Sequence, residues 1–251
     1  MKTKLILLIF IFFFASCTSS TQDQQKKTKI AQAIKKEGDA FQSQGDYTAA
    51  LTKLLEAEKI DPKSPYIQNS LGLAYMGKKR YDMAIPAFDK ALSLKPDYTD
   101  ALNNLGAAYL RQEEWDTAIA KFTLVLDDLI YATPHFPLAN IGWAYLGKKN
   151  YPKAQSFFLK AIDEKPGFTT AIHGLTQVYI RTGQTDRAIS YLHKNLRRTP
   201  NVPILHADLA QCYETKGQLR QAVKAWQLVL QLSPENSSLY RKAEERLFEI
   251  K

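Results

Sequence analysis

The chain has 251 residues, of which 45% are hydrophobic and 24% are charged. This much apolar material can form a buried core, which excludes a wholly disordered protein. The formal net charge is +9, but Lys and Arg are scattered along the chain, and this argues against nucleic-acid binding.

The first seventeen residues read MKTKLILLIFIFFFASC. Two lysines precede an apolar run from Leu5 to Phe14, and a small Ala-Ser pair comes directly before Cys17. This order predicts a signal peptide over 1–16, because a bilayer-spanning helix needs about 20 apolar residues. A cysteine in this place resembles the lipobox of bacterial lipoproteins and implies that Cys17 carries lipid. A plain cleaved signal with an incidental cysteine is the alternative.

The residues that follow predict a location and a tether. By the same resemblance, Thr18 in place of Asp directs a lipoprotein to the outer membrane, facing the periplasm. Residues 18–29, TSSTQDQQKKTK, contain no apolar side chain. We therefore expect residues 17–30 to be a flexible tether between the lipid and the folded part.

A 34-residue period begins at residue 31 and continues to residue 236. Position 8 of the period is small or short, position 11 is aromatic, position 20 is Ala, and position 24 is large and apolar. The predicted repeats are 31–64, 65–98, 99–132, 135–168, 169–202 and 203–236. The position-11 aromatic residues are Phe41, Tyr75, Tyr109, Tyr145, Tyr179 and Tyr213.

Each repeat predicts two helices. Positions 4, 7, 8 and 11 share one face of a first helix, and positions 20, 24 and 27 share one face of a second. Glycines at position 15 mark the turn between them, and prolines at position 32 end the second helix. This pattern resembles the tetratricopeptide repeat (TPR), which implies an all-α superhelical solenoid of six helix-turn-helix repeats. Residues 237–251 predict a capping helix with Leu239, Ala243 and Leu247 inward and charges outward.

The third repeat is irregular. It gains two residues and lacks the position-32 proline, while Pro134 and Pro137 follow Tyr131. A tolerated loop insertion is one interpretation. The other is that it is characteristic of a family. With its lipobox, its length, its six repeats and this interruption, the chain resembles the type IV pilus biogenesis and stability lipoproteins, the PilF/PilW family. The resemblance implies a pilotin-like role in localising and assembling the pilus secretin, and it carries over only Cys17.

In a TPR array, first-helix positions 2, 5, 9 and 12 line the concave surface, where a protein partner binds. The predicted partner-binding residues, including two asparagines at position 6, are Tyr66, Asn69, Leu73, Asn103, Asn104, Leu110, Phe136, Asn140, Trp143, His173 and Gln177. An amphipathic helix or an extended segment of a partner suits this apolar and aromatic surface. The alternatives are that Phe136 packs against neighbouring repeats and that the asparagines are ordinary repeat residues.

No pattern in the sequence predicts catalysis. The four histidines lie without metal-ligand spacing, and neither a G-x-S-x-G, a P-loop nor an H-E-x-x-H motif occurs. We therefore expect no enzyme activity, catalytic residue, metal, cofactor or small-molecule substrate. Cys212 is expected to be a buried thiol, unpaired with Cys17. The alternative functions are an envelope adaptor that recruits peptidoglycan hydrolases or outer-membrane assembly machinery, and a periplasmic chaperone or regulator without lipid.

Overall fold

The structure is a computed structural model that describes residues 2–250, with side chains from residue 22 onward. The described residues form thirteen helices and no strand, which confirms the predicted all-α fold. The chain divides into two compact units, Met1–Gln112 and Glu113–Lys251, called here the N-terminal and C-terminal units. The division falls inside the third predicted repeat, between its two helices.

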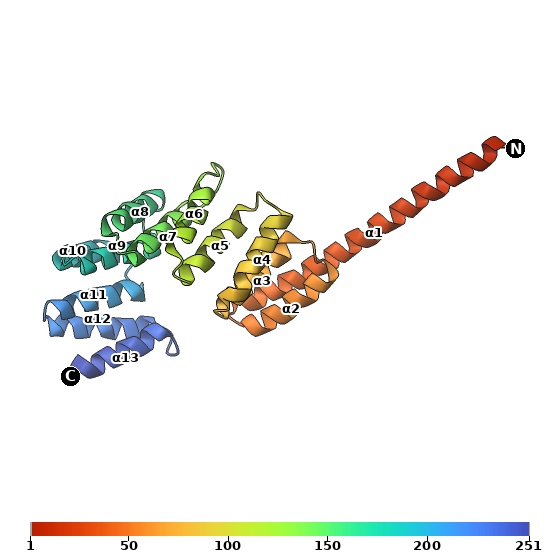
Figure 1. Ribbon diagram of the computed structural model, residues 1–251. Coiled ribbons are helices and arrows are strands. Elements are labelled where there is room, and N and C mark those ends of the chain that lie inside the picture. The colour runs from red at the N-terminus through yellow and green to blue at the C-terminus, as the bar shows by residue number, and fades with distance from the viewer. Residues whose placement is uncertain (1, 251) are drawn as a thin grey trace. The chain divides into compact units, whose positions relative to one another are not determined.

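In the N-terminal unit, each helix contacts the next along the chain, and the first helices of the repeats also contact one another in order, α1 with α3 and α3 with α5 (Figure 1). The first helices therefore form one layer. The helices are α1 (Lys2–Ser43), α2 (Tyr47–Ile60), α3 (Pro65–Gly77), α4 (Tyr81–Leu94) and α5 (Thr99–Arg111).

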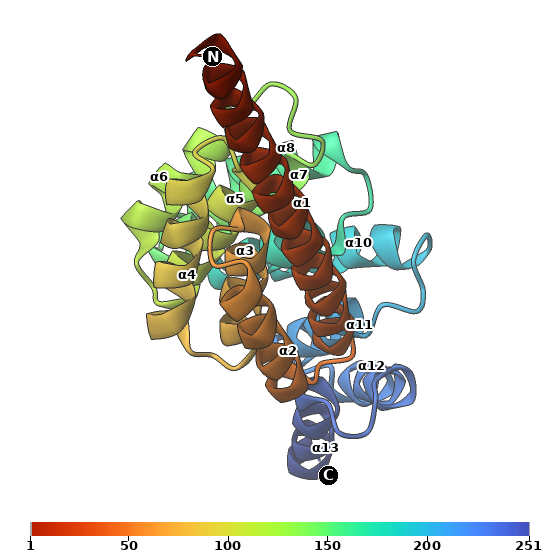
Figure 2. The same cartoon turned by 90° about the vertical axis from the view of Figure 1, so that its right-hand side faces the viewer.

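The C-terminal unit follows the same plan. Its first helices α7, α9, α11 and α13 contact one another in sequence, and α12 lies alongside α13 at the C-terminal end (Figures 1 and 2). The helices are α6 (Trp115–Leu126), α7 (His135–Gly147), α8 (Tyr151–Glu164), α9 (Thr169–Arg181), α10 (Thr185–Leu196), α11 (Pro203–Thr215), α12 (Leu219–Leu232) and α13 (Ser238–Ile250).

The core follows the repeat positions predicted from the sequence. All six alanines at position 20 are completely buried, and the large residues at position 24 are buried as well. The small residues at position 8 make room for them: a Cβ added to Gly72 would come within 2.4 Å of the Phe88 ring, and one added to Gly142 within 2.7 Å of the Phe158 ring. The small-to-large pairing between the two helices of a repeat is therefore confirmed. Five of the six position-11 aromatic residues are only partly buried.

The N-terminal segment differs from the expected flexible tether. Helix α1 runs from Lys2 to Ser43 and so includes residues 17–30 as well as the first helix of repeat one. The physical reason is composition, because this segment has no Gly or Pro to stop a helix, while Gln and Lys favour one. An i, i+4 ion pair between Lys27 and Asp23, at 3.0 Å, adds support.

Three local features depart from the regular repeat. The irregular third repeat ends early, since α6 stops at Leu126, and an eight-residue connection, 127–134, precedes α7. In this connection Leu129 is 98% exposed and Ile130 is 91% exposed. Helix α4 continues through Pro86 without interruption. The capping helix α13 turns Ala243 inward and most of its charged side chains outward as expected, and it also leaves Phe248 81% exposed.

Candidate functional site

The predicted partner-binding residues lie on the layers of first helices, six in the N-terminal unit and five in the C-terminal unit. We call Tyr66, Asn69, Tyr98 and Asn104 the N-terminal inner surface, and Phe136, Trp143, His173 and Gln177 the C-terminal inner surface. The two surfaces belong to different units and are described separately.

An aromatic pair dominates the N-terminal inner surface. The rings of Tyr66 and Tyr98 meet edge to face, with centroids 5.3 Å apart. Lys95 lies over both rings and donates a hydrogen bond to the Tyr66 hydroxyl at 3.3 Å. Tyr66 is nevertheless 45% exposed. The ring is therefore held in place while one side remains open to solvent.

The asparagines of this surface bind each other. Asn104 Nδ2 donates to Asn69 Oδ1 at 3.0 Å, and Asn69 Nδ2 donates to the Tyr98 hydroxyl at 3.3 Å. Asn69 is buried, so it positions its neighbours and offers little surface to a partner. Burial, together with the nearby Asp100 carboxylate, raises the pKa of Tyr98 to about 12.

The remaining predicted residues of the N-terminal unit contribute less. Leu73 packs against a core cluster that contains Phe88 and Leu105, which is the structural role expected of an inward-facing leucine. Asn103 and Leu110 are half-buried on α5.

The C-terminal inner surface begins with a second aromatic cluster. Phe136 meets Phe168 edge to face at 5.3 Å, and the His135 ring lies 4.8 Å from Phe168. Lys165 lies 5.8 Å from the centre of the Phe168 ring. These residues occupy the same repeat positions as Tyr66, Tyr98 and Lys95. The arrangement therefore recurs, and its outer ring is again half-exposed, because Phe136 is 43% exposed.

Trp143 lies next on this surface. Its indole meets the buried Phe158 ring edge to face at 5.4 Å and lies 5.2 Å from the His173 ring. Trp143 is half-buried. A large aromatic side chain that is fixed on one side and accessible on the other has the properties of an interface anchor. Asn140, one turn before Trp143, is also half-buried.

A buried carboxylate orients the polar part of this surface. Asp208 on α11 is only 2% exposed. Its Oδ2 lies 2.7 Å from His173 Nδ1, and its Oδ1 accepts a hydrogen bond from Gln177 Nε2 at 2.9 Å. Burial raises the pKa of Asp208, and the bonds to His173 and Gln177 act in the opposite direction. The carboxylate fixes both side chains on α9, from which they reach the surface.

The sequence reasoning missed Tyr98, Phe168 and Asp208. Asp208 left a signal, because it stands at position 6, where repeats three and four carry Asn. An acidic residue at an inward helix position requires a polar partner. Tyr98 and Phe168 stand at position 34, directly before the next first helix, a position without a recurrent residue type in the six repeats.

The described part of the chain offers little support for a metal site, a reactive thiol or a membrane-spanning helix. No group of three or more His, Cys, Asp and Glu side chains there could hold a metal ion. Cys212 is completely buried, and this burial raises the pKa of its thiol to about 12. Among the described helices, none combines the length and apolar composition needed to cross a membrane. The side chain of Cys17, the predicted lipid site, lies outside the described residues.

Comparison with protein families finds tetratricopeptide repeats in both units, and only some of the matches share the bounds of the predicted repeats. The matching descriptions are "TPR repeat" over residues 38–79 and "Tetratricopeptide repeat" over residues 65–98, 87–120, 138–168, 171–204 and 205–236.

Solved structures share the fold. The chain resembles PilW, described as a widely conserved type IV pilus biogenesis factor, with a TM-score of 0.73 and 22% identity over 86% of this chain and 98% of that one. It also resembles PilF of Pseudomonas aeruginosa, with a TM-score of 0.67 and 17% identity over 88% and 99% of the two chains. A curated relative, the uncharacterized protein ycf37 of Cyanophora paradoxa, is 29% identical over 107 residues, which are 41% of this chain and 62% of that protein.

Proposed function

Because this chain belongs to the tetratricopeptide-repeat family, we propose that it is a scaffold whose inner surfaces hold a protein partner. The single observation that carries this proposal is the C-terminal inner surface. There Phe136 is fixed by neighbouring rings and remains 43% exposed. Beside it along the layer of first helices, Trp143 and His173 are also accessible.

This surface has the composition of a binding hot spot. Aromatic anchors whose geometry is fixed before binding lose little conformational entropy when a partner arrives. The polar groups of His173 and Gln177, held by Asp208, provide directional hydrogen bonding at the edge of the apolar area. An amphipathic helix or extended segment with one or two large apolar side chains fits this chemistry.

The finer proposal is that the scaffold is anchored by lipid in the outer membrane. The support is the order of a basic start, an apolar run, Ala-Ser and Cys17. Each buried CH₂ of a lipid chain contributes about 0.8 kcal/mol, so two or three chains on one residue give stable anchoring. Replacement of Cys17 by Ala should release the protein from the membrane fraction. Unchanged membrane association would remove the lipid anchor from the account.

We further propose that the partner belongs to the type IV pilus machinery and that the protein aids localisation or assembly of the secretin. The fold shared with PilW and PilF over most of the chain supports this proposal, as does the irregular connection after the third repeat. The test is removal of the gene, followed by measurement of secretin multimers and surface pili. We expect both to fall, and normal levels of both would refute the pilus role.

A further inference from the structure

Helix α13 has the position of the first helix of a seventh repeat. With residue 237 as position 1, the buried Ala243 stands at position 7, Glu244 at position 8 and Leu247 at position 11. Like other first helices, α13 contacts both helices of the preceding repeat, α11 and α12. On the face of α13 that corresponds to the one a second helix covers in other repeats, Glu244 is exposed and Leu247 is only partly buried.

The other repeats show what this face normally holds. In repeat four the position-11 ring of Tyr145 stacks on Phe157 from the second helix at 5.5 Å, and in repeat five Tyr179 meets Tyr191 at 6.1 Å. At position 8, Gly142 lies against Phe158 of the second helix. On α13 the corresponding residues are Leu247 and Glu244.

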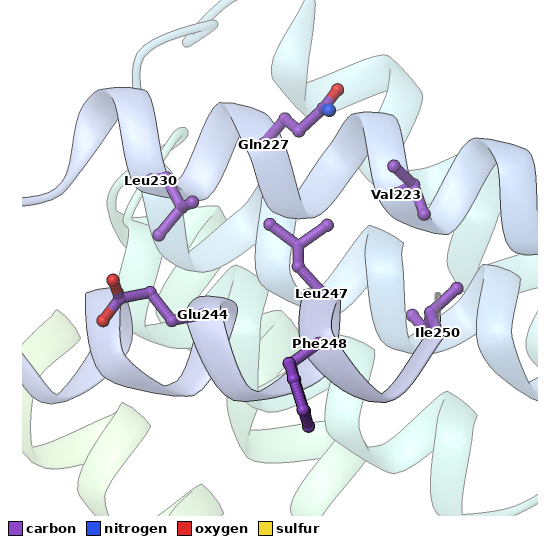
Figure 3. A pocket seen from close by; sticks show the side chains of 7 residues that line it. All are labelled: Val223, Gln227, Leu230, Glu244, Leu247, Phe248 and Ile250. Carbon is purple, nitrogen blue, oxygen red and sulfur yellow. The ribbon is translucent and has the colours of Figure 1, made fainter.

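This face of α13 lines an apolar groove (Figure 3). Val223 and Leu230 of α12 form one wall, and Leu247 and Ile250 of α13 form the other, while Phe248 lies at the rim with its ring pointing away from α12. Phe248 is 81% exposed. An exposed phenylalanine beside further apolar side chains is more typical of an interaction site than of a surface that contacts only solvent.

The two ends of the groove carry opposite charges. Arg220 and Lys224 lie at the end formed by Ile250, near the start of α12. Glu244 lies at the other end, beside Leu230 (Figure 3). A helix that runs parallel to α12 would place its first turn by the two cations and its last turn by Glu244. This polarity favours acidic residues in the first turn and basic residues in the last, the same distribution that the helix dipole favours.

We propose that the α12–α13 groove binds an amphipathic helix from a partner protein, in the place that a second helix takes within each repeat. The helix carries an apolar stripe against Leu247 and Phe248, an acidic first turn, and a Lys or Arg in its last turn opposite Glu244. This surface is distinct from the C-terminal inner surface, because α13 contacts neither α7 nor α9, the helices that carry the residues of that surface. The two binding proposals can therefore fail independently.

The chain itself supplies a probe with this charge pattern. Residues 183–198, which include α10, have Asp186 in the first turn of the helix and Lys194 in the last. A fluorescent, stapled peptide of this sequence can be titrated against the purified full-length chain by anisotropy. We expect saturable binding with a Kd in the micromolar range, as is usual for a single helix in a groove.

Matched variants make the test specific. Glu244→Lys should weaken binding about tenfold, whereas Glu245→Lys, a change at the next residue, which is also exposed, should leave it unchanged. A peptide with Lys194→Glu should restore binding to the Glu244→Lys chain. Phe248→Ser should abolish binding without altering the helical circular dichroism, because Phe248 is exposed.

Three binding results would overturn the proposal. They are absence of saturable binding at millimolar peptide, equal weakening by Glu244→Lys and Glu245→Lys, and retention of full affinity by Phe248→Ser. Sedimentation that shows a dimer of the full chain, lost in Phe248→Ser, would assign the groove to a second copy and so refute a partner helix.

Discussion

At position 15, every repeat turns from its first to its second helix through a left-handed backbone conformation. Gly45, Gly183 and Gly217 have φ angles of 80°, 73° and 69°. The other three repeats adopt the same conformation with a side chain present. These residues are Lys79, Glu113 and Lys149, with φ angles of 59°, 64° and 58°. The glycines predicted the turn, but its geometry does not depend on glycine alone.

This difference gives a test at a single position. Lys149→Gly should raise the free energy of unfolding by up to about 1 kcal/mol, because a non-glycine residue pays about 1–2 kcal/mol in this conformation, less the entropy lost by glycine. Gly183→Ala should lower it by a similar amount. Urea denaturation of both variants checks the pair, and a less stable Lys149→Gly would contradict the explanation.

Tyr98 provides a pH test of the N-terminal inner surface. Its pKa is raised from 10.0 to about 12, first by burial and then by Asp100 and Tyr66. Because the folded pKa lies above the unfolded value, its contribution to stability is complete below about pH 10 and is lost as the pH rises through about 12. An ultraviolet titration should show a late tyrosinate step that Tyr98→Phe removes. A step unchanged by this substitution would contradict the burial of Tyr98.

The candidate site was only partly predictable at this scale. Position counting predicted that Phe136, Trp143, His173 and Gln177 are accessible, because helical periodicity fixes which side of a helix a residue faces. It could not show that Asn69 and Asn104 bind each other, since the pairing depends on the distance between two helices 35 residues apart in sequence. For the same reason it missed the role of Asp208 between His173 and Gln177.

At the scale of elements, a contact between position 8 and position 24 joins the two helices in the first, second and fourth repeats. Phe158 is completely buried against Gly142 and Gly174. Phe158→Ala should lower the free energy of unfolding by about 3–5 kcal/mol through lost burial and a cavity. Leu159→Ala, one residue along on the same helix and 39% exposed, should change it much less. Equal effects in thermal denaturation would show that the pairing is not the main contact.

The connection 127–134 carries a second element-scale prediction. Leu129 and Ile130 are almost fully exposed, so Leu129→Ser with Ile130→Ser should change the unfolding free energy by less than about 0.5 kcal/mol. If the connection is a mark of the proposed function, pili and secretin multimers should fall in cells that carry this double variant. Normal levels of both would instead identify the connection as a tolerated insertion.

Helix boundaries were the most predictable feature of the fold. Every first helix from α3 to α11 begins at position 1 of its repeat, and every second helix from α2 to α12 begins at position 17. The period succeeds because small, aromatic and proline residues act at fixed distances within one helix pair. The period makes no prediction outside residues 31–236. For residues 17–30, polar composition alone indicated a tether, but helix α1 continues through them because they contain no Gly or Pro.

At the scale of the whole molecule, neighbouring repeats are connected by a recurring polar contact. Lys148 pairs with Asp116 and Lys216 with Asp186, each joining position 14 of one repeat to position 18 of the repeat before it. Lys78 donates to Thr48 in the same way at 2.8 Å. These exposed contacts contribute little to stability individually. Their recurrence indicates that each repeat is positioned mainly by its neighbours, as in other repeat proteins.

We propose that the C-terminal inner surface, and not the layer of second helices, holds a partner from the pilus machinery. The most direct measurement is photo-crosslinking in living cells with benzoylphenylalanine placed at Phe136 or at Leu159, which are similarly exposed at 43% and 39%. The account predicts a crosslinked product that reacts with an antibody against the secretin from position 136 and none from position 159. A secretin product from position 159 alone, or none from position 136, would contradict it.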